Sequence, residues 1–228
     1  MPQSIGNFDE FSDSYTQDIS NALGKLDGES TYFSSRKVAV MRDLYGEIEP
    51  RIILDYGCGI GSLIPFLHEI FPESEIWATD LSIESLRQVQ SKYPYVKIFQ
   101  PDEVDPGSCD LVVLSNVLHH VPPDTRGKLM SEICEKLATN GSLVVIEHNP
   151  LNPVTRRIVS NCVFDEGVIL VKRRTLRDLL AKNVGLMKCS SRYFLYFPPS
   201  LSRLQFLERF LYYVPLGGQY MSKFERKQ

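Results

Sequence analysis

The apolar residues of this chain follow two alternating patterns between about residue 50 and residue 148. Short runs rich in Ile, Leu and Val, typical of buried strands, alternate with segments whose apolar positions recur at helical spacing. The short runs predict strands at 51–56, 75–79, 96–99, 110–114 and 142–146. The segments between them predict helices at 62–71, 82–92 and 124–137. We expect Ser82 and Asp124 to cap two of these helices, and Asn140-Gly141 to form a turn.

The C-terminal third predicts further elements in a less regular order. A short helix is expected at 154–160, and a second at 175–183 with Thr175 as its N-cap. Two strands at 187–197 and 219–226 are separated by an aromatic helical segment. Repeated strand–helix–strand units require a parallel sheet with right-handed crossovers. We therefore expect an α/β protein: a Rossmann-like three-layer sandwich with a mostly parallel seven-stranded sheet and an antiparallel C-terminal strand.

One domain is expected to account for residues 1–228. A chain of 228 residues buries a sizeable core within a single α/β domain. No internal repeat or low-complexity tract divides it. We expect a helical lid in 1–48, a cofactor-binding core in 49–148, and in 149–228 a substrate-side insert followed by the final strand pair.

Composition indicates the cellular compartment of the protein and the kinds of partner it binds. A formal net charge of -3 offers no general attraction to a polyphosphate backbone, so nucleic acid is not an expected partner. The five cysteines include no CxxC pair, which argues against a disulfide framework and a thiolate zinc site. No basic and apolar leader opens the sequence, and no apolar run reaches the length of a membrane span. We expect a reduced, cytoplasmic protein.

A glycine-rich turn follows the first predicted strand. Glycine at Gly57, Gly59 and Gly61 permits positive φ angles and lets a ligand approach the backbone closely. Asp55 lies just before this turn, and Asp80 ends the second strand 21 residues after Gly59. That spacing suits a carboxylate that accepts hydrogen bonds from ribose hydroxyls. The alternative is that Asp80 only begins the turn into the next helix.

Two absences indicate the kind of nucleoside cofactor. The third glycine of the dinucleotide fingerprint is replaced by Ser62. The sequence contains no G-x-x-x-x-G-K-[ST] phosphate loop. Both observations favour a cofactor without a pyrophosphate, although an oxidoreductase that binds NAD stays open as an alternative.

The same segments resemble class I S-adenosylmethionine-dependent methyltransferases. Leu54–Gly61 resembles the D-x-G-C-G-x-G signature of that family, and Asp80-Leu81-Ser82 resembles its ribose-binding motif. Residues 110–121 resemble its fourth motif, and 137–143 its L-x-P-G-G-x-L turn. Here Thr139-Asn140 stand where Pro-Gly is usual, in a turn that the family places away from the cofactor.

The resemblance implies S-adenosylmethionine as cofactor and assigns roles around the turn. The backbone of Gly57 and Gly59 would approach the amino acid part of the cofactor. Asp55 would orient the turn or meet the cofactor's amino group through water. Asp80 and Leu81 belong to the motif that binds the ribose.

Five further residues are expected to bind the cofactor. By the resemblance, Asp102 or its neighbour Glu103 would lie beside the adenine, and the carbonyl of Ser115 would meet the methionyl ammonium. N-terminal helices cover the cofactor in similar enzymes, and we expect Tyr15 and Lys37 to reach its carboxylate from there.

Histidines are the candidates for acid–base chemistry at the methyl acceptor. His148 closes the fifth strand, at the edge of the sheet where ligands bind, and His120 follows the fourth. An imidazole suits general-base work near neutral pH, so we predict both as catalytic; the alternative is a structural role. No HxxH or HExxH spacing occurs, and Ser115-Asn116 occupy the place of the carboxylates that divalent-metal O-methyltransferases carry. We expect no metal site.

The acceptor is less well defined by the sequence. Basic residues at 156–157, 172–174 and 177 suit either a carboxylate or phosphate on the acceptor or a solvated charged face. Aromatic residues between 193 and 213 would mark a hydrophobic acceptor or a homodimer face if they are exposed. We predict methyl transfer to a small molecule, most readily to an oxygen. A regulatory protein that binds S-adenosylmethionine without catalysis is the alternative outside enzymes.

Overall fold

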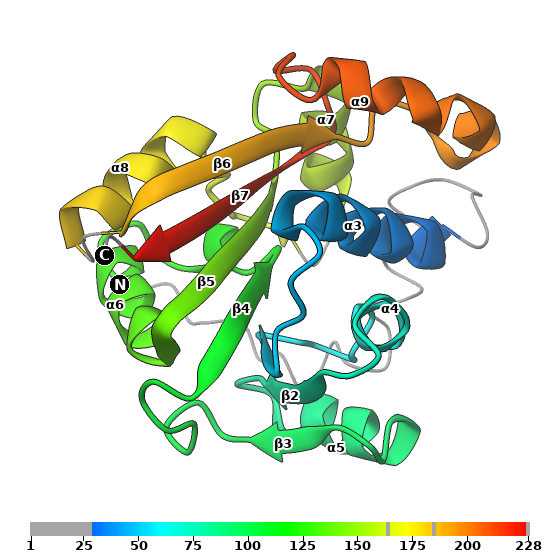
Figure 1. The fold of residues 1–228 in the computed structure, drawn as a ribbon. Coiled ribbons are helices and arrows are strands. Elements are labelled where there is room, and N and C mark those ends of the chain that lie inside the picture. The colour runs from blue at the N-terminus through cyan, green and yellow to red at the C-terminus, as the bar shows by residue number, and fades with distance from the viewer. Residues whose placement is uncertain (1–28, 163–164, 184–185, 227–228) are drawn as a thin grey trace.

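The computed structural model describes residues 29–162, 165–183 and 186–226, which form a seven-stranded sheet with helices on both faces (Figure 1). The strands are β1 (Ile52–Tyr56), β2 (Glu75–Thr79), β3 (Lys97–Phe99), β4 (Cys109–Ser115), β5 (Leu137–His148), β6 (Leu186–Phe194) and β7 (Gln219–Arg226). Their order in the sheet is β3-β2-β1-β4-β5-β7-β6. Strands β1 to β5 are parallel, and β7 runs antiparallel to both β5 and β6. The predicted mostly parallel sheet is confirmed.

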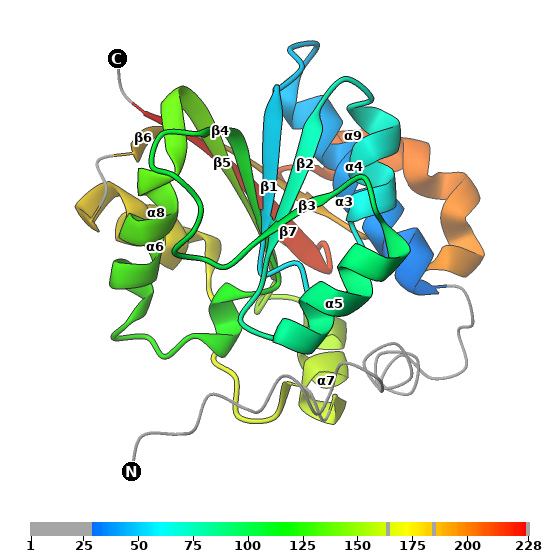
Figure 2. The ribbon, with the colours of Figure 1, turned by 90° about the horizontal axis from the view of Figure 1, so that it is seen from below.

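The helices form two outer layers. They are α3 (Glu29–Tyr45), α4 (Ile64–Ile70), α5 (Ile83–Lys92), η1 (Leu118–His120), α6 (Arg126–Glu135), α7 (Pro153–Asn161), α8 (Arg173–Asn183), η3 (Pro199–Leu207) and α9 (Glu208–Leu211). Figure 2 shows α3, α4 and α5 on one side of the sheet and α6 and α8 on the other. The architecture is therefore the expected three-layer sandwich. Among the residues described, no helix has both the length and the apolar character needed to cross a membrane.

Two hydrophobic cores lie on opposite faces of the sheet because successive strand residues point in opposite directions. In β1, Ile53 belongs to the core beneath α3, α4 and α5, whereas Leu54 belongs to the core beneath α6 and α8. In β4, Val113 and Val112 are divided in the same way. These strands are apolar at consecutive positions because both of their faces are covered.

Helix α3 is the described part of the predicted N-terminal lid. This helix buries Val38, Val40 and Met41 completely in the core on one face of the sheet. It therefore belongs to an outer layer of the sandwich, and it also lies next to the carboxyl end of β4. Lys37, one residue before Val38, reaches the end of β4 instead. Tyr15, the other predicted lid contact, lies outside the described residues.

Two predicted helix caps and one predicted turn are wrong. Thr125, not Asp124, is the N-cap residue of α6, and its side chain makes no capping bond. Helix α8 begins at Arg173, so Thr175 lies inside it. Asn140-Gly141 lies within β5, at an irregularity in its pairing with β4. A Cβ at Gly141 would lie 2.8 Å from the carbonyl oxygen of Cys109, so close backbone packing, not a turn, requires this glycine.

The predicted cap of α5 is confirmed. The Ser82 backbone is extended, and its hydroxyl accepts a hydrogen bond of 3.1 Å from the amide of Ser85. Cys58, Cys109, Cys134 and Cys162, the cysteines whose side chains are described, are buried, and none of them forms a disulfide.

Replacing Ser82 with Ala should lower the free energy of unfolding by about 1 kcal/mol, because the amide of Ser85 loses its partner. Urea denaturation followed by circular dichroism measures this change. Thr125→Ala is the matched control, since Thr125 occupies an N-cap without a side-chain capping bond. Equal losses in the two variants would contradict the capping role of Ser82.

Candidate active site

The glycine turn joins β1 to α4 and is anchored to the end of β2. Gly57, Gly59 and Gly61 have φ angles of 73°, 53° and 77°, in the left-handed region that favours glycine. The amides of Gly57 and Cys58 both donate to the carbonyl oxygen of Thr79, at 2.8 and 3.0 Å. The end of β2 therefore holds the turn in place.

The three glycines have different surroundings. A Cβ at Gly57 would lie 2.6 Å from Val117, and one at Gly61 would lie 2.8 Å from Ile64. A Cβ at Gly59 would have no described atom within 4 Å. Packing thus explains Gly57 and Gly61, whereas Gly59 presents bare backbone to open space. This is the side from which a ligand can approach the turn.

Asp80 ties the turn to the next helix. Its carboxylate accepts a 2.8 Å hydrogen bond from the amide of Gly59 and a 2.9 Å bond from the amide of Ser82. The structure therefore brings Asp80 to the glycine turn, as its spacing predicts. The alternative structural role of Asp80 is observed, and a carboxylate that accepts two amide bonds still has lone pairs to offer a ribose.

Asp55 and Lys37 place opposite charges beneath the turn. Asp55 is 2% exposed, and its Oδ2 atom has no hydrogen-bond partner within the described residues. Burial raises the pKa of Asp55 to about 7, against the opposing effect of the Lys37 charge. Burial lowers the pKa of Lys37 to about 8, and its ammonium donates to Ser115 Oγ at 3.0 Å. A buried carboxylate oxygen without a partner indicates a place for a ligand.

A second polar group lies at the ends of β4, β5 and β7. The Gln219 amide nitrogen lies 3.3 Å from Asn116 Oδ1 and 3.5 Å from His148 Nδ1. Asn116 has a φ angle of 58°, which is uncommon for a residue other than glycine. Gln219 Oε1 is buried and has no partner in the described part of the chain. Sequence reasoning did not select Gln219, since a glutamine at the start of a strand carries no motif.

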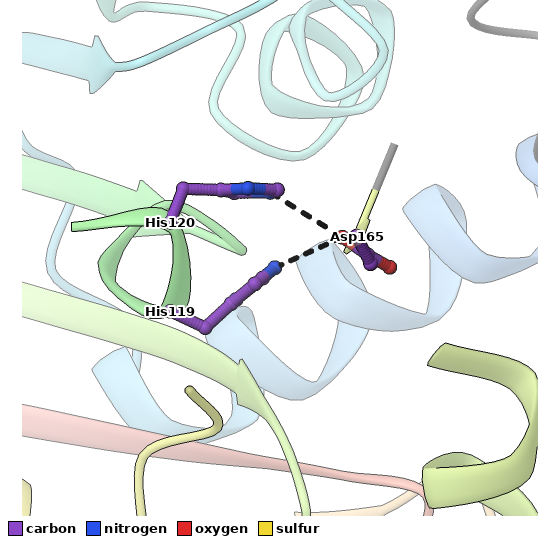
Figure 3. A group of neighbouring side chains, drawn as sticks. All are labelled: His119, His120 and Asp165. Carbon is purple, nitrogen blue, oxygen red and sulfur yellow. Dashed lines mark ion pairs between the residues drawn. The ribbon is translucent and has the colours of Figure 1, made fainter. Parts of the chain in front are cut away.

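The two adjacent histidines of η1 lie beside two acids. His119 is 2% exposed, and its Nδ1 lies 2.6 Å from Glu147 Oε2. The Nε2 atoms of His119 and His120 both lie 3.4 Å from Asp165 Oδ1 (Figure 3). Sequence reasoning missed Glu147 and Asp165. An acid inside the apolar run of β5 was a signal for Glu147, but Asp165 had none.

The surroundings of His119, His120 and His148 shift their pKa values in opposite directions. Burial lowers the pKa of His119, but the carboxylates of Glu147 and Asp165 outweigh it and raise the value to about 9. Burial, assisted by the charge of His119, lowers the pKa of His120 and of His148 to about 4. The two histidines predicted as catalytic are therefore neutral near pH 7 and are weak bases.

A cavity of about 800 Å³ lies between α7 and the segment that follows it. Arg156 and Arg157 line it from α7, and Asp165 lines it from the following segment. Of the predicted basic cluster, the residues at 172–174 and 177 are not among its lining residues. The cavity thus connects two of the predicted arginines with the acid beside the histidines.

Residues 53–141 match a family model described as a methyltransferase domain. This segment contains β1 to β4, the glycine turn, Asp80 and the histidine pair. This segment is a methyltransferase domain. The match decides against the NAD-binding alternative.

Two curated relatives and one solved structure extend the comparison. The methyltransferase domain and its flanks are 25% identical over 158 residues to trans-aconitate 2-methyltransferase of Rhodopseudomonas palustris, covering 66% of this chain and 61% of the relative. They are 31% identical over 113 residues to malonyl-[acyl-carrier protein] O-methyltransferase of Legionella pneumophila, covering 46% and 39%. The chain thus matches less than two thirds of the length of these relatives. An S-adenosylmethionine-dependent methyltransferase from Archaeoglobus fulgidus shares the fold, with a TM-score of 0.67, 15% identity, and coverage of 93% of this chain and 99% of that one.

Three further residues that the sequence predicts as cofactor contacts are exposed: Leu81, Asp102 and Glu103. Leu81 is 68% exposed, directly after Asp80. Asp102 and Glu103 are exposed in the turn after β3, where Glu103 accepts a 2.7 Å bond from the amide of Gln100. Glu103 therefore closes its own turn.

Because Gly59 and Gly61 have different surroundings, we expect their substitution by Ala to have different effects on stability and on ligand binding. Gly61→Ala should destabilise the fold by about 2–4 kcal/mol, because it adds a steric clash to an unfavourable φ. Gly59→Ala should cost about 1–2 kcal/mol and still abolish tight binding of S-adenosylhomocysteine, because the new methyl group fills the open side of the turn. Urea denaturation and isothermal titration calorimetry measure the two effects. Full binding by a folded Gly59→Ala protein would show that no ligand approaches there.

Proposed function

We propose that this chain transfers a methyl group from S-adenosylmethionine to a carboxylate oxygen of a small acceptor. The observation that carries the proposal is the buried oxygen of Asp55, which has no partner in the described part of the chain, at the start of a turn whose Gly59 backbone faces open space. A polar site of this kind costs stability unless a ligand completes it. S-adenosylmethionine, when bound, would supply an activated methyl group on its sulfonium.

The residues below the turn suit the amino acid part of the cofactor. Asp55 would hold the cofactor's ammonium, and Lys37 its carboxylate, because each buried charge then gains an opposite charge. Ser115, which already accepts from Lys37, would hold the ammonium through its backbone carbonyl. Gly57 and Gly59 would let the cofactor reach these groups.

The nucleoside part of the cofactor would lie along the ends of β2 and β3. Asp80 would bind the ribose hydroxyls, with Leu81 beside it. Asp102 would meet the adenine, with Glu103 as the alternative. Tyr15, by the same proposal, belongs to the lid over the cofactor.

Two features favour a carboxylate as the acceptor. A carboxylate carries no proton at neutral pH, so its methylation needs only in-line positioning and no base. This suits a site whose His120 and His148 have a pKa of about 4. The names of both relatives refer to acids, trans-aconitate and a malonyl group. An acceptor that carries a proton would depend on His148 or His120 as its base, and both are weak bases with a pKa of about 4.

The cavity beside α7 is the proposed acceptor site. Arg156 and Arg157 bring two positive charges to its wall, which suits a dicarboxylate or tricarboxylate.

Three aromatic side chains are exposed on η3, on α9 and in the turn after α9: Phe206, Phe210 and Tyr213, with exposed fractions of 60%, 68% and 82%. These exposed aromatics support the homodimer prediction. A cytoplasmic location and the absence of a nucleic-acid partner remain proposals that rest on composition.

The proposal is tested by incubating the chain with S-adenosylmethionine and small acids, phenols or amines, and by measuring S-adenosylhomocysteine. We expect turnover with one or more di- or tricarboxylic acids. Turnover with phenols alone would overturn the carboxylate assignment. Cofactor binding without turnover on any class would favour the non-catalytic alternative.

Affinity for S-adenosylhomocysteine should be highest between about pH 7 and pH 8. Above a pKa of about 7 Asp55 is ionised and attracts the ligand's ammonium, and below about 8 Lys37 is protonated and attracts its carboxylate. Raising the pH from 6 to 7.5 should therefore strengthen binding roughly fivefold to tenfold. Calorimetric titration at each pH measures the profile. In Asp55→Asn the gain over this range should vanish, and an unchanged profile would exclude Asp55 as its source.

The double variant Arg156→Gln, Arg157→Gln should raise KM for the best acid at least about tenfold, with kcat nearly unchanged. Each arginine contributes a charge-assisted hydrogen bond worth about 1.5–3 kcal/mol. Initial-rate kinetics separate the two parameters. Arg174→Gln is the matched control, because Arg174 belongs to the predicted basic cluster but pairs with Asp178 on α8. Similar KM values in both proteins would place the acceptor elsewhere.

A further inference from the structure

Three side chains from two distant parts of the sequence point toward one small volume. His119 and His120 come from η1, immediately after β4, and Asp165 follows α7. Figure 3 shows both imidazole rings reaching toward the Asp165 carboxylate. One ligand atom from each residue lies within 4.8 Å of the other two. Each of these residue types is a common metal ligand.

The separations also suit a metal ion between the three ligands. Each Nε2 atom lies 3.4 Å from Asp165 Oδ1, at the long end of the range for direct N–H···O contacts. Four ligands at roughly 2.0–2.1 Å from a zinc ion lie roughly 3.3–3.4 Å from one another in a tetrahedron. The two nitrogen–oxygen distances therefore match the edges of such a site.

The surroundings of His119 are those of a metal ligand. Its Nδ1 contacts Glu147 Oε2 at 2.6 Å, and the other oxygen of Glu147 accepts from the amide of Leu118 at 2.7 Å. This anchored carboxylate orients the ring so that Nε2 faces Asp165, as second carboxylates do beside zinc-bound histidines. Glu147 and Asp165 together carry two negative charges, which balance one divalent cation in this buried place.

We propose that His119, His120 and Asp165 bind a divalent transition-metal ion of the zinc type. The three protein ligands leave the fourth tetrahedral position open. Asp165 also lines the cavity next to α7, so the ion lies at the border of that cavity. Binding of the ion ties the segment after α7 to the end of β4. This inference does not rest on the proposed methyl transfer, and it replaces the expectation from sequence that no metal is bound.

The test is calorimetric titration of the full, metal-stripped chain with Zn²⁺ alone, without cofactor or acceptor. We expect binding of one equivalent and a rise in the melting temperature on saturation. Co²⁺ should give the visible bands of a tetrahedral site without a thiolate charge-transfer band, which separates this site from the cysteines. No saturable binding of Zn²⁺, or thiolate bands with Co²⁺, would overturn the proposal.

Two variants with partly exposed side chains identify the ligands. Asp165→Asn and His120→Ala should each weaken Zn²⁺ binding at least about tenfold while circular dichroism shows a folded protein. His68→Ala is the matched control, because His68 lies on α4, against Tyr95. Retained affinity in both folded ligand variants, or an equal loss in His68→Ala, would place the ion elsewhere. Failure of methyl transfer with Zn²⁺ still bound would overturn only the proposed function.

Discussion

Parallel pairing of β1, β2, β4 and β5 is the constraint on which the site depends. It aligns the carboxyl ends of these strands at one edge of the sheet, where side chains no longer need to pack in the core. One polar residue of the site lies at or next to the end of each strand: Asp55, Asp80, Ser115 and His148. The backbone completes the arrangement, because two amides of the glycine turn donate to the last carbonyl of β2. The turn is positioned only while β1 and β2 remain paired.

Several charged side chains are buried at this edge of the sheet, and not all of them are fully paired with an opposite charge or a hydrogen-bond partner. Lys37 and Asp55 are both buried, and each moves the pKa of the other back toward its ordinary value. Glu147 and His119 form a closer pair and are satisfied by direct contact. Asp55 keeps an oxygen without a partner among the described residues. Such a group costs stability in the free protein, and proteins retain this kind of cost where a ligand uses it.

Local patterns predicted the elements well and their ends less well. The short apolar runs that predict β1 and β2 and the helical pattern that predicts α5 arise from burial of residues within one segment, so each can be recognised from that segment alone. The ends of α6 and α8 depend on capping and packing by other segments, and the predictions at Asp124 and Thr175 were wrong. The sequence predicts a turn at Gly141, but close packing against the backbone of β4 is the reason for a glycine at this position.

The sequence by itself determined the three-layer fold, the glycine turn and Asp80 at the turn. These features follow from spacing within strand–helix units or from motifs whose residues lie close in the chain. Only the tertiary structure placed Asp165 beside His119 and His120, Glu147 behind His119, and Gln219 beside His148. Asp165 lies 45 residues after His120, and contacts between such distant segments depend on how the chain returns over the sheet. Neither hydrophobic periodicity nor motif spacing carries that information.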